Sequence, residues 1–154
     1  MLNKNEIKER LNKIYKKIPD DFPCRHCHSC CGPIIWFKPE EIIIREYLEL
    51  HNLDYIVWSI DEFKKNNMRC PYLKDDRCSI YYVRPLVCRL QGHTEDLPCI
   101  KFKTRQFLSQ KIVDEIKTEF DQLVTQLEGN DVFYGTKKFD YLQKPFNSIY
   151  PAKY

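Results

Sequence analysis

The sequence predicts a mainly α-helical fold with irregular, cysteine-rich loops, and the alternative is an α+β fold with few short strands. Apolar residues recur at helical spacing near both ends of the chain. The segment between them carries eight cysteines and few helix signals. Because 154 residues is the length of one domain, we expect a single domain spanning residues 1–154.

The N-terminal segment, residues 1–18, is predicted to form an amphipathic helix. Its apolar stripe consists of Ile7, Leu11, Ile14 and Ile18. Lysines and one arginine fill much of the remaining surface, and we interpret them as a solvated polar face. Pro19 ends the helix ahead of the first cysteines.

A second helix is predicted after the apolar run 34–37, which we expect to be extended. Pro39 suits the first position of this helix, which should continue to about His51. Glu40 and Glu41 in its first turn complement the helix dipole. We expect one side of the helix to carry Ile43, Tyr47 and Leu50, broadened by Ile42 and Ile44.

Two shorter features follow before and within the cysteine-rich region. Ser59 and Glu62 form a capping-box pattern, which predicts a short helix before Asn66. Residues 74–77 are polar and predict a turn, and residues 78–82 are expected to form a short strand.

Residues 101–128 predict the longest helix of the chain. Its apolar stripe consists of Leu108, Ile112, Ile116, Phe120, Leu123 and Leu127. We interpret this stripe as core, because it spans only about three heptads of a coiled-coil pattern. Residues 131–154 are rich in aromatic side chains and suggest an arm packed over the domain.

The eight cysteines all lie between residues 24 and 99, which marks residues 22–100 as the core of the candidate site. The first four form the pattern C-x2-C-x2-C-C, and the others follow at wider spacing. They are Cys24, Cys27, Cys30, Cys31, Cys70, Cys78, Cys88 and Cys99. Because thiolates bind soft metals, we expect these cysteines to be metal ligands in one metal- or cluster-organised domain.

Three chemistries are compatible with this pattern. The C-x2-C-x2-C run matches ferredoxin-type iron–sulfur ligation of the 4Fe–4S kind, and Cys70-Pro71 matches its remote cysteine–proline pair. Zinc held by four cysteines, or by three and one histidine, is the second possibility. A disulfide framework ranks last, because the first thirty residues show no secretory signal. The adjacent pair Cys30-Cys31 suggests either two sites or one centre that bridges several metals.

The later cysteines lie in the elements C-P-x-L, C-x-I-Y and R-P-x-x-C-R, which begin at Cys70, Cys78 and Arg84. With the upstream C-x2-C-x2-C-C, residues 22–100 resemble the CxxCxxCC, or YkgJ-like, family of zinc- or iron-chelating cysteine-cluster proteins. The resemblance implies chelation through these cysteines and kinship with the chelating part of flagellin lysine methylases. It also implies that Arg84 and Arg89 lie beside the cofactor, where guanidinium groups would offset thiolate charge.

Other function classes receive less support from the sequence. A net charge of +3 is too balanced to indicate nucleic-acid binding, and no apolar run approaches a membrane span. We expect a cytoplasmic protein, with a protein partner possible and its oligomeric state open. No nucleophile elbow, Walker loop or H-E-x-x-H motif occurs, so enzyme activity is left open. His26, His28 and His93 are weaker candidates for metal ligands, because eight thiols make imidazole ligands unnecessary.

The first hypothesis is therefore an iron–sulfur protein with a structural or redox role. The cluster would be held by Cys24, Cys27 and Cys30 with at least one later cysteine. A zinc-stabilised binding module without catalysis is the second hypothesis. A protein-modifying enzyme related to flagellin lysine methylases is the third.

Overall fold

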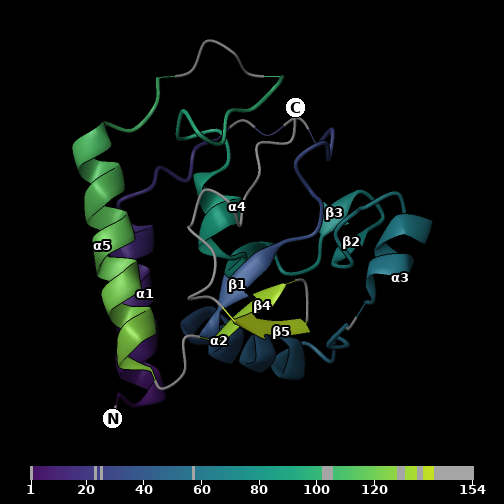
Figure 1. Ribbon diagram of the computed structural model, residues 1–154, viewed down its shortest axis with the longest axis horizontal. Helices are drawn as coiled ribbons and strands as arrows, with labels where there is room; N and C mark the ends of the chain where they lie inside the picture. Colours follow the sequence, from purple (N-terminus) through teal and green to yellow (C-terminus); the bar gives the residue numbers. More distant parts are fainter. Residues whose placement is uncertain are drawn as a thin grey trace.

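The structure is a computed structural model that describes residues 2–22, 24, 26–56, 58–101, 106–127, 131–134 and 137–140. Helices dominate these residues, which confirms the predicted fold class (Figure 1). The helices are α1 (Lys4–Tyr15), α2 (Lys38–Leu50), α3 (Ile60–Lys65), the 3₁₀ helix η1 (Tyr81–Val83), α4 (Leu86–Leu90) and α5 (Gln110–Gln126). The strands are β1 (Ile35–Phe37), β2 (Leu73–Lys74), β3 (Arg77–Cys78), β4 (Asp131–Tyr134) and β5 (Lys137–Asp140).

Helix α1 lies beside α5 on the left of Figure 1 and is fixed at its start by Asn3. The Asn3 side chain accepts the N–H groups of Asn5 and Glu6, and the Glu6 carboxylate accepts the N–H of Asn3. This reciprocal capping satisfies backbone donors that have no partner within the helix. The predicted stripe is confirmed, because Ile7, Leu11 and Ile14 are buried.

The sequence suggested that the basic face of α1 is a solvated surface, but part of this face forms ion pairs with neighbouring helices. Lys4 and Lys8 both form ion pairs with Glu46 of α2. Lys17, just beyond α1, donates a hydrogen bond to Glu119 of α5 at 2.6 Å. Acidic side chains of two neighbouring helices therefore face part of the lysine-rich surface.

Two hydrophobic clusters form the core, and strand β1 contributes to both. The first core cluster joins α1, α4 and α5 around Phe37. The second core cluster is built from Trp36, Ile44, Leu48, Tyr72 and Ile80 together with Cys70. Successive side chains of a strand point to opposite sides, which explains why Trp36 and Phe37 belong to different clusters.

Helix α2 was predicted to within one residue at each end, and its predicted apolar face is wrong at Leu50. Leu50 is 73% exposed, whereas Ile44, Leu48 and the two acidic residues Glu40 and Glu41 are buried. The helix packs against both clusters, so its apolar residues are divided between two sides. A single apolar stripe cannot describe a helix in that position.

The elements around the later cysteines are short. Helix α3 begins after Ser59, whose hydroxyl accepts the N–H of Glu62, as the capping-box pattern predicted. Strands β2 and β3 form a hairpin whose two turn residues, Asp75 and Asp76, have φ of 47° and 58°. Positive φ at both central positions is typical of the tight turns that join antiparallel strands. The strand predicted over residues 78–82 is wrong, because β3 ends at Cys78 and η1 follows.

Helix α5 begins at Gln110, after the N-cap residue Ser109, and not at residue 101 as predicted. Its buried residues include Ile116, Phe120 and Leu123, so the stripe is core, as the sequence indicated. Of the predicted C-terminal arm, residues 131–134 and 137–140 form β4 and β5. These strands extend β1 into an antiparallel sheet of order β1-β4-β5. The remainder of that arm lies outside the described residues.

Within the described residues, no helix has both the length and the apolar character needed to cross a membrane.

The contact between Phe37 and Phe120 leads to a stability prediction. The two rings meet edge to face with centroids 5.2 Å apart, and Phe120 is 1% exposed. Phe120→Ala should lower the free energy of unfolding by about 3–5 kcal/mol, because it leaves a cavity in the first core cluster. Chemical denaturation measures this loss. Tyr82→Ala, at a position 78% exposed, is the control and should change stability by less than about 0.5 kcal/mol. Equal losses for the two variants would contradict this description of the core.

Candidate metal centre

The cysteines come from several separate segments of the fold. Four lie in the loop before β1, Cys70 precedes the β2–β3 hairpin, and Cys88 lies on α4. A backbone hydrogen bond of 3.0 Å from the N–H of Cys70 to the carbonyl of Cys31 joins the first two segments. Cys31, Cys70, Cys78 and Cys88 all take part in the second core cluster.

Four thiols are linked by electrostatic interactions, and we call them the thiol tetrad. The tetrad consists of Cys30, Cys31, Cys70 and Cys88. The Cys30 and Cys31 side chains share a hydrogen bond, and Cys31 also interacts electrostatically with Cys70 and Cys88. Cys88 in turn interacts with Cys70 and Cys30. The tetrad therefore gathers thiols from three segments that are distant in the sequence.

The surroundings of the tetrad disfavour isolated thiolates. The hydrogen bond with Cys30, together with burial, raises the pKa of the Cys31 thiol far above its usual value. Burial raises the pKa of Cys88, and the nearby thiols Cys70 and Cys78 raise it further. Because a metal ion binds the thiolate form, metal binding here would release protons and replace this mutual repulsion with attraction.

Three cysteines outside the tetrad receive a backbone N–H from the residue two positions later. His26 donates its N–H to the Cys24 sulfur at 3.4 Å. Ser29 donates to Cys27, and this hydrogen bond is the main reason why the pKa of Cys27 is lowered. A backbone hydrogen bond from Ile80 likewise acts to lower the pKa of Cys78, although burial outweighs it and leaves that pKa raised. Hydrogen bonds to sulfur stabilise the thiolate form that binds metals.

The eight predicted ligands differ in how they interact with the tetrad. Cys27 interacts with Cys30, and Cys78 interacts with Cys88, so both adjoin the tetrad. Cys24 and Cys99 are not part of these interactions in the portion of the chain that is described. Cys24 is exposed and Cys99 is half-buried.

The donor set fits a thiophilic metal, although the tetrad does not close around one point. Within the described residues, no group of three or more His, Cys, Asp or Glu side chains is arranged to hold a metal ion. The donors are nevertheless sulfur atoms that interact electrostatically with one another. The two adjoining cysteines, Cys27 and Cys78, also each interact with a cationic side chain. Soft thiolate donors of this kind suit zinc and iron–sulfur clusters.

The two arginines expected beside the cofactor have different environments. Arg84 lies near Cys78 and acts to lower the pKa of that thiol. Arg89 donates hydrogen bonds to the carbonyls of Arg84 and Tyr82, and its guanidinium lies 4.0 Å from the centre of the Tyr15 ring. Arg84 is therefore placed to offset thiolate charge, whereas Arg89 ties together the segments around α4. A role for either residue in cofactor binding stays a prediction.

The histidines lie at the edge of this arrangement. The Nε2 atom of His28 is buried and forms no hydrogen bond within the described residues, and it lies 3.8 Å from an Asp76 carboxylate oxygen. His26 is exposed, with its ring 6.1 Å from that of His28. His93 is buried, and its ring packs against Phe22.

Two residues important to the site's surroundings, Glu40 and Glu41, were not identified from the sequence as buried. Each is only 2% exposed. Glu40 accepts hydrogen bonds from the backbone N–H of Phe37 at 3.0 Å, from the N–H of Leu86 at 2.5 Å and from the Tyr15 hydroxyl at 3.1 Å. A signal was available, because Glu40, Ile44 and Leu48 recur every four residues and so share one helix face.

Glu41 is bound in a different direction. Its carboxylate accepts hydrogen bonds from the Trp36 indole, from Arg45 and from the Tyr55 hydroxyl. These partners belong to β1, to α2 itself and to the segment after α2. Glu41 therefore supports the second core cluster through Trp36, without a contact to α4.

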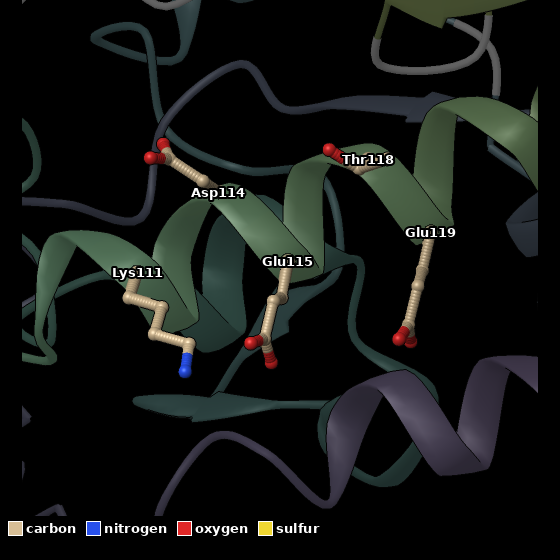
Figure 2. Close-up of a pocket in the computed structure, with 5 residues that line it drawn as sticks. All are labelled: Lys111, Asp114, Glu115, Thr118 and Glu119. Carbon is tan, nitrogen blue, oxygen red and sulfur yellow. The ribbon is translucent and has the colours of Figure 1, made fainter.

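An open groove lies elsewhere, along the exposed side of α5. It is lined by Lys111, Asp114, Glu115, Thr118 and Glu119 (Figure 2). Lys17 reaches Glu115 and Glu119 from the end of α1. No cysteine lines this groove, so it is separate from the candidate metal centre.

Comparison with known proteins identifies one family. The family model named CxxCxxCC, described as "Putative zinc- or iron-chelating domain", matches residues 23–122. This match includes all eight cysteines and extends into α5. No curated protein and no solved structure matches the chain significantly.

The burial of Glu40 predicts a specific pH dependence. Burial raises its pKa from 4.5 to about 7, although the N–H groups of Leu86 and Phe37 counteract this. A carboxyl with a raised pKa in the folded state holds its proton after the unfolded chain has lost it. Stability should therefore fall as pH rises between 4.5 and about 7, by up to about 1.4 kcal/mol per pH unit. Denaturation at several pH values should show this fall in the wild type and not in Glu40→Gln. Identical pH profiles for the two proteins would contradict the shift.

Proposed function

The chain belongs to the CxxCxxCC family of chelating domains, and from this premise we propose that it is an iron–sulfur protein whose cluster is held by cysteine thiolates. Its role is structural or redox. The observation that carries the proposal is the thiol tetrad, in which Cys30, Cys31, Cys70 and Cys88 come together from three segments.

The number of interacting thiols is sufficient for a cluster. Including the adjoining Cys27 and Cys78, six thiols form one connected group. A 4Fe–4S cluster and a single zinc ion each take four cysteine ligands, so the preference for the cluster rests on the sequence pattern. The C-x2-C-x2-C spacing and the Cys70-Pro71 pair point in the same direction.

The residues of the chain have definite tasks in such a centre. Four cysteines drawn from the tetrad, Cys24 and Cys27 would supply the ligands, and a bound cluster would add one-electron redox chemistry or a cross-link between the segments. The N–H groups of Ser29 and Ile80 hold negative charge at their sulfurs. Cys70 is buried and Cys88 is half-buried among apolar side chains, which limits the access of water. Both features tune cluster potentials.

Zinc is the second candidate, and one specific observation favours it. The hydrogen-bonded thiols of Cys30 and Cys31 face the same region. Two thiolates on one tetrahedral zinc ion, with bonds of about 2.3 Å, lie roughly 3.8 Å apart. Adjacent cysteines in contact suit that separation, and a zinc-stabilised binding module would need no catalysis.

Analysis of anaerobically purified protein decides between the two candidates. The iron–sulfur proposal expects a brown protein that contains iron and acid-labile sulfide in similar amounts. The colour arises from sulfur-to-iron charge transfer. A colourless protein with stoichiometric zinc and no sulfide would overturn the proposal in favour of the zinc module. Protein that binds neither metal would contradict both.

Single cysteine replacements test the ligand assignment. Cys30→Ser removes a member of the tetrad. Loss of a residue that only supports a ligand typically weakens metal binding by about 10–100-fold, and Cys30→Ser should have a larger effect. Cys99→Ser is the matched control and should retain the metal content of the wild type, because Cys99 is not among the interacting thiols. Metal analysis after anaerobic purification gives the result. Full occupancy in the Cys30→Ser protein would exclude this assignment.

A further inference from the structure

We propose that Glu40 is a positioning residue of the metal centre, whose buried carboxylate fixes helix α4 and thereby the place of the Cys88 sulfur. This inference rests on the proposed function, because it concerns the same thiols. It assigns to Glu40 a task that its position in the first turn of α2 does not suggest.

Helix α4 is short, so its position depends on contacts with other parts of the fold. It spans only Leu86–Leu90, and its N-cap residue Pro85 provides no side-chain hydrogen bond. The first N–H groups of a helix have no partner within the helix. The Oε1 atom of Glu40 accepts the N–H of Leu86 at 2.5 Å and so supplies this missing partner from another helix.

Glu40 is itself held firmly. Its Oε2 atom accepts the N–H of Phe37 at 3.0 Å at the start of its own helix, and the Tyr15 hydroxyl donates to Oε1 at 3.1 Å. The same oxygen therefore receives donors from α1 and from α4. Because the carboxylate is 2% exposed, water cannot readily replace a lost donor. A shift of α4 would leave a buried polar group without a partner.

Cys88 lies between two points of attachment. Leu86, two residues before it, is bound by Glu40. Arg89, the next residue, lies over the ring of Tyr15 and donates to the carbonyls of Arg84 and Tyr82. Tyr15 thus contacts both the Glu40 carboxylate, which binds Leu86, and the Arg89 guanidinium. The segment that carries the Cys88 sulfur is therefore fixed both before and after the cysteine.

Glu41 provides a matched comparison within the same helical turn. It has the same 2% exposure and also accepts three hydrogen bonds, but its donors are Trp36, Arg45 and Tyr55. No donor comes from α4. Replacement of either glutamate by glutamine exchanges one acceptor oxygen for an NH2 donor. Only at Glu40 does an affected donor, the Leu86 N–H, belong to the helix that carries Cys88.

The test compares full-length Glu40→Gln, Glu41→Gln and Tyr15→Phe with the wild type. Each metal-free protein is titrated anaerobically with cobalt(II), which reports thiolate ligation through its charge-transfer absorption. Glu40→Gln should weaken cobalt binding by about 10–100-fold, the usual effect of losing a residue that orients a metal ligand. Glu41→Gln should bind cobalt like the wild type, even if its melting temperature falls by the same amount.

A second measurement does not depend on metal. The rate at which a maleimide alkylates each cysteine in the metal-free protein is followed by mass spectrometry. Glu40→Gln should accelerate alkylation of Cys88 while Cys78 keeps its rate. Tyr15→Phe keeps the Leu86 bond to Glu40 and should accelerate Cys88 alkylation less. If Glu40→Gln does not fold, Tyr15→Phe carries the test, and an unchanged Cys88 rate then overturns the proposal.

The outcomes separate this inference from the proposed function. A wild type that contains neither iron with sulfide nor zinc contradicts the proposed function, while the alkylation rates still test the position of α4. Wild-type cobalt affinity and wild-type Cys88 alkylation in Glu40→Gln overturn the positioning role. Equal losses in Glu40→Gln and Glu41→Gln also overturn it, because they would reflect general destabilisation.

Discussion

The burial of two adjacent carboxylates at the start of α2 is the constraint on which the arrangement of the fold depends. A buried carboxylate is unfavourable unless donors replace the water that it loses. Glu40 finds its donors in α1 and α4, and Glu41 finds them in β1 and the segment after α2. Apolar contacts alone tolerate sliding, whereas these directed bonds do not. We infer that the carboxylate pair selects one arrangement of the segments that surround the thiols.

The sequence was informative wherever structure is determined locally. The stripes of α1 and α5 were predicted because one face of each helix meets a single cluster. The cap at Ser59 and the polar hairpin turn follow from side chains a few residues apart. The apolar face of α2 was predicted wrongly at Leu50, because three consecutive isoleucines, residues 42–44, are compatible with several faces. Pairing of β1 with β4 joins residues about one hundred positions apart, and no local pattern contains that information.

The candidate site was predicted in composition and not in arrangement. All eight cysteines were predicted to be ligands, and the family match covers every one of them, while the assignment of individual ligands stays a prediction. Spacing could not show that Cys30 and Cys31 meet Cys70 and Cys88, since this depends on the closure of long loops. The support from Glu40 was missed for a related reason. An acidic residue in the first turn of a helix is already explained by the helix dipole, so nothing in the sequence demanded a second task.

The alternation of Trp36 and Phe37 across β1 has a consequence for how this chain can diverge. Four residues separate Cys31 from Trp36, and the two aromatic rings enter different clusters. Inserting or deleting a single residue there would exchange the two sides of the strand, because side chains in a strand alternate with a period of two. Relatives that keep both clusters should therefore accept substitutions in this connection but preserve its length. The number of residues between Cys31 and Trp36 should therefore be the same in relatives that share this fold.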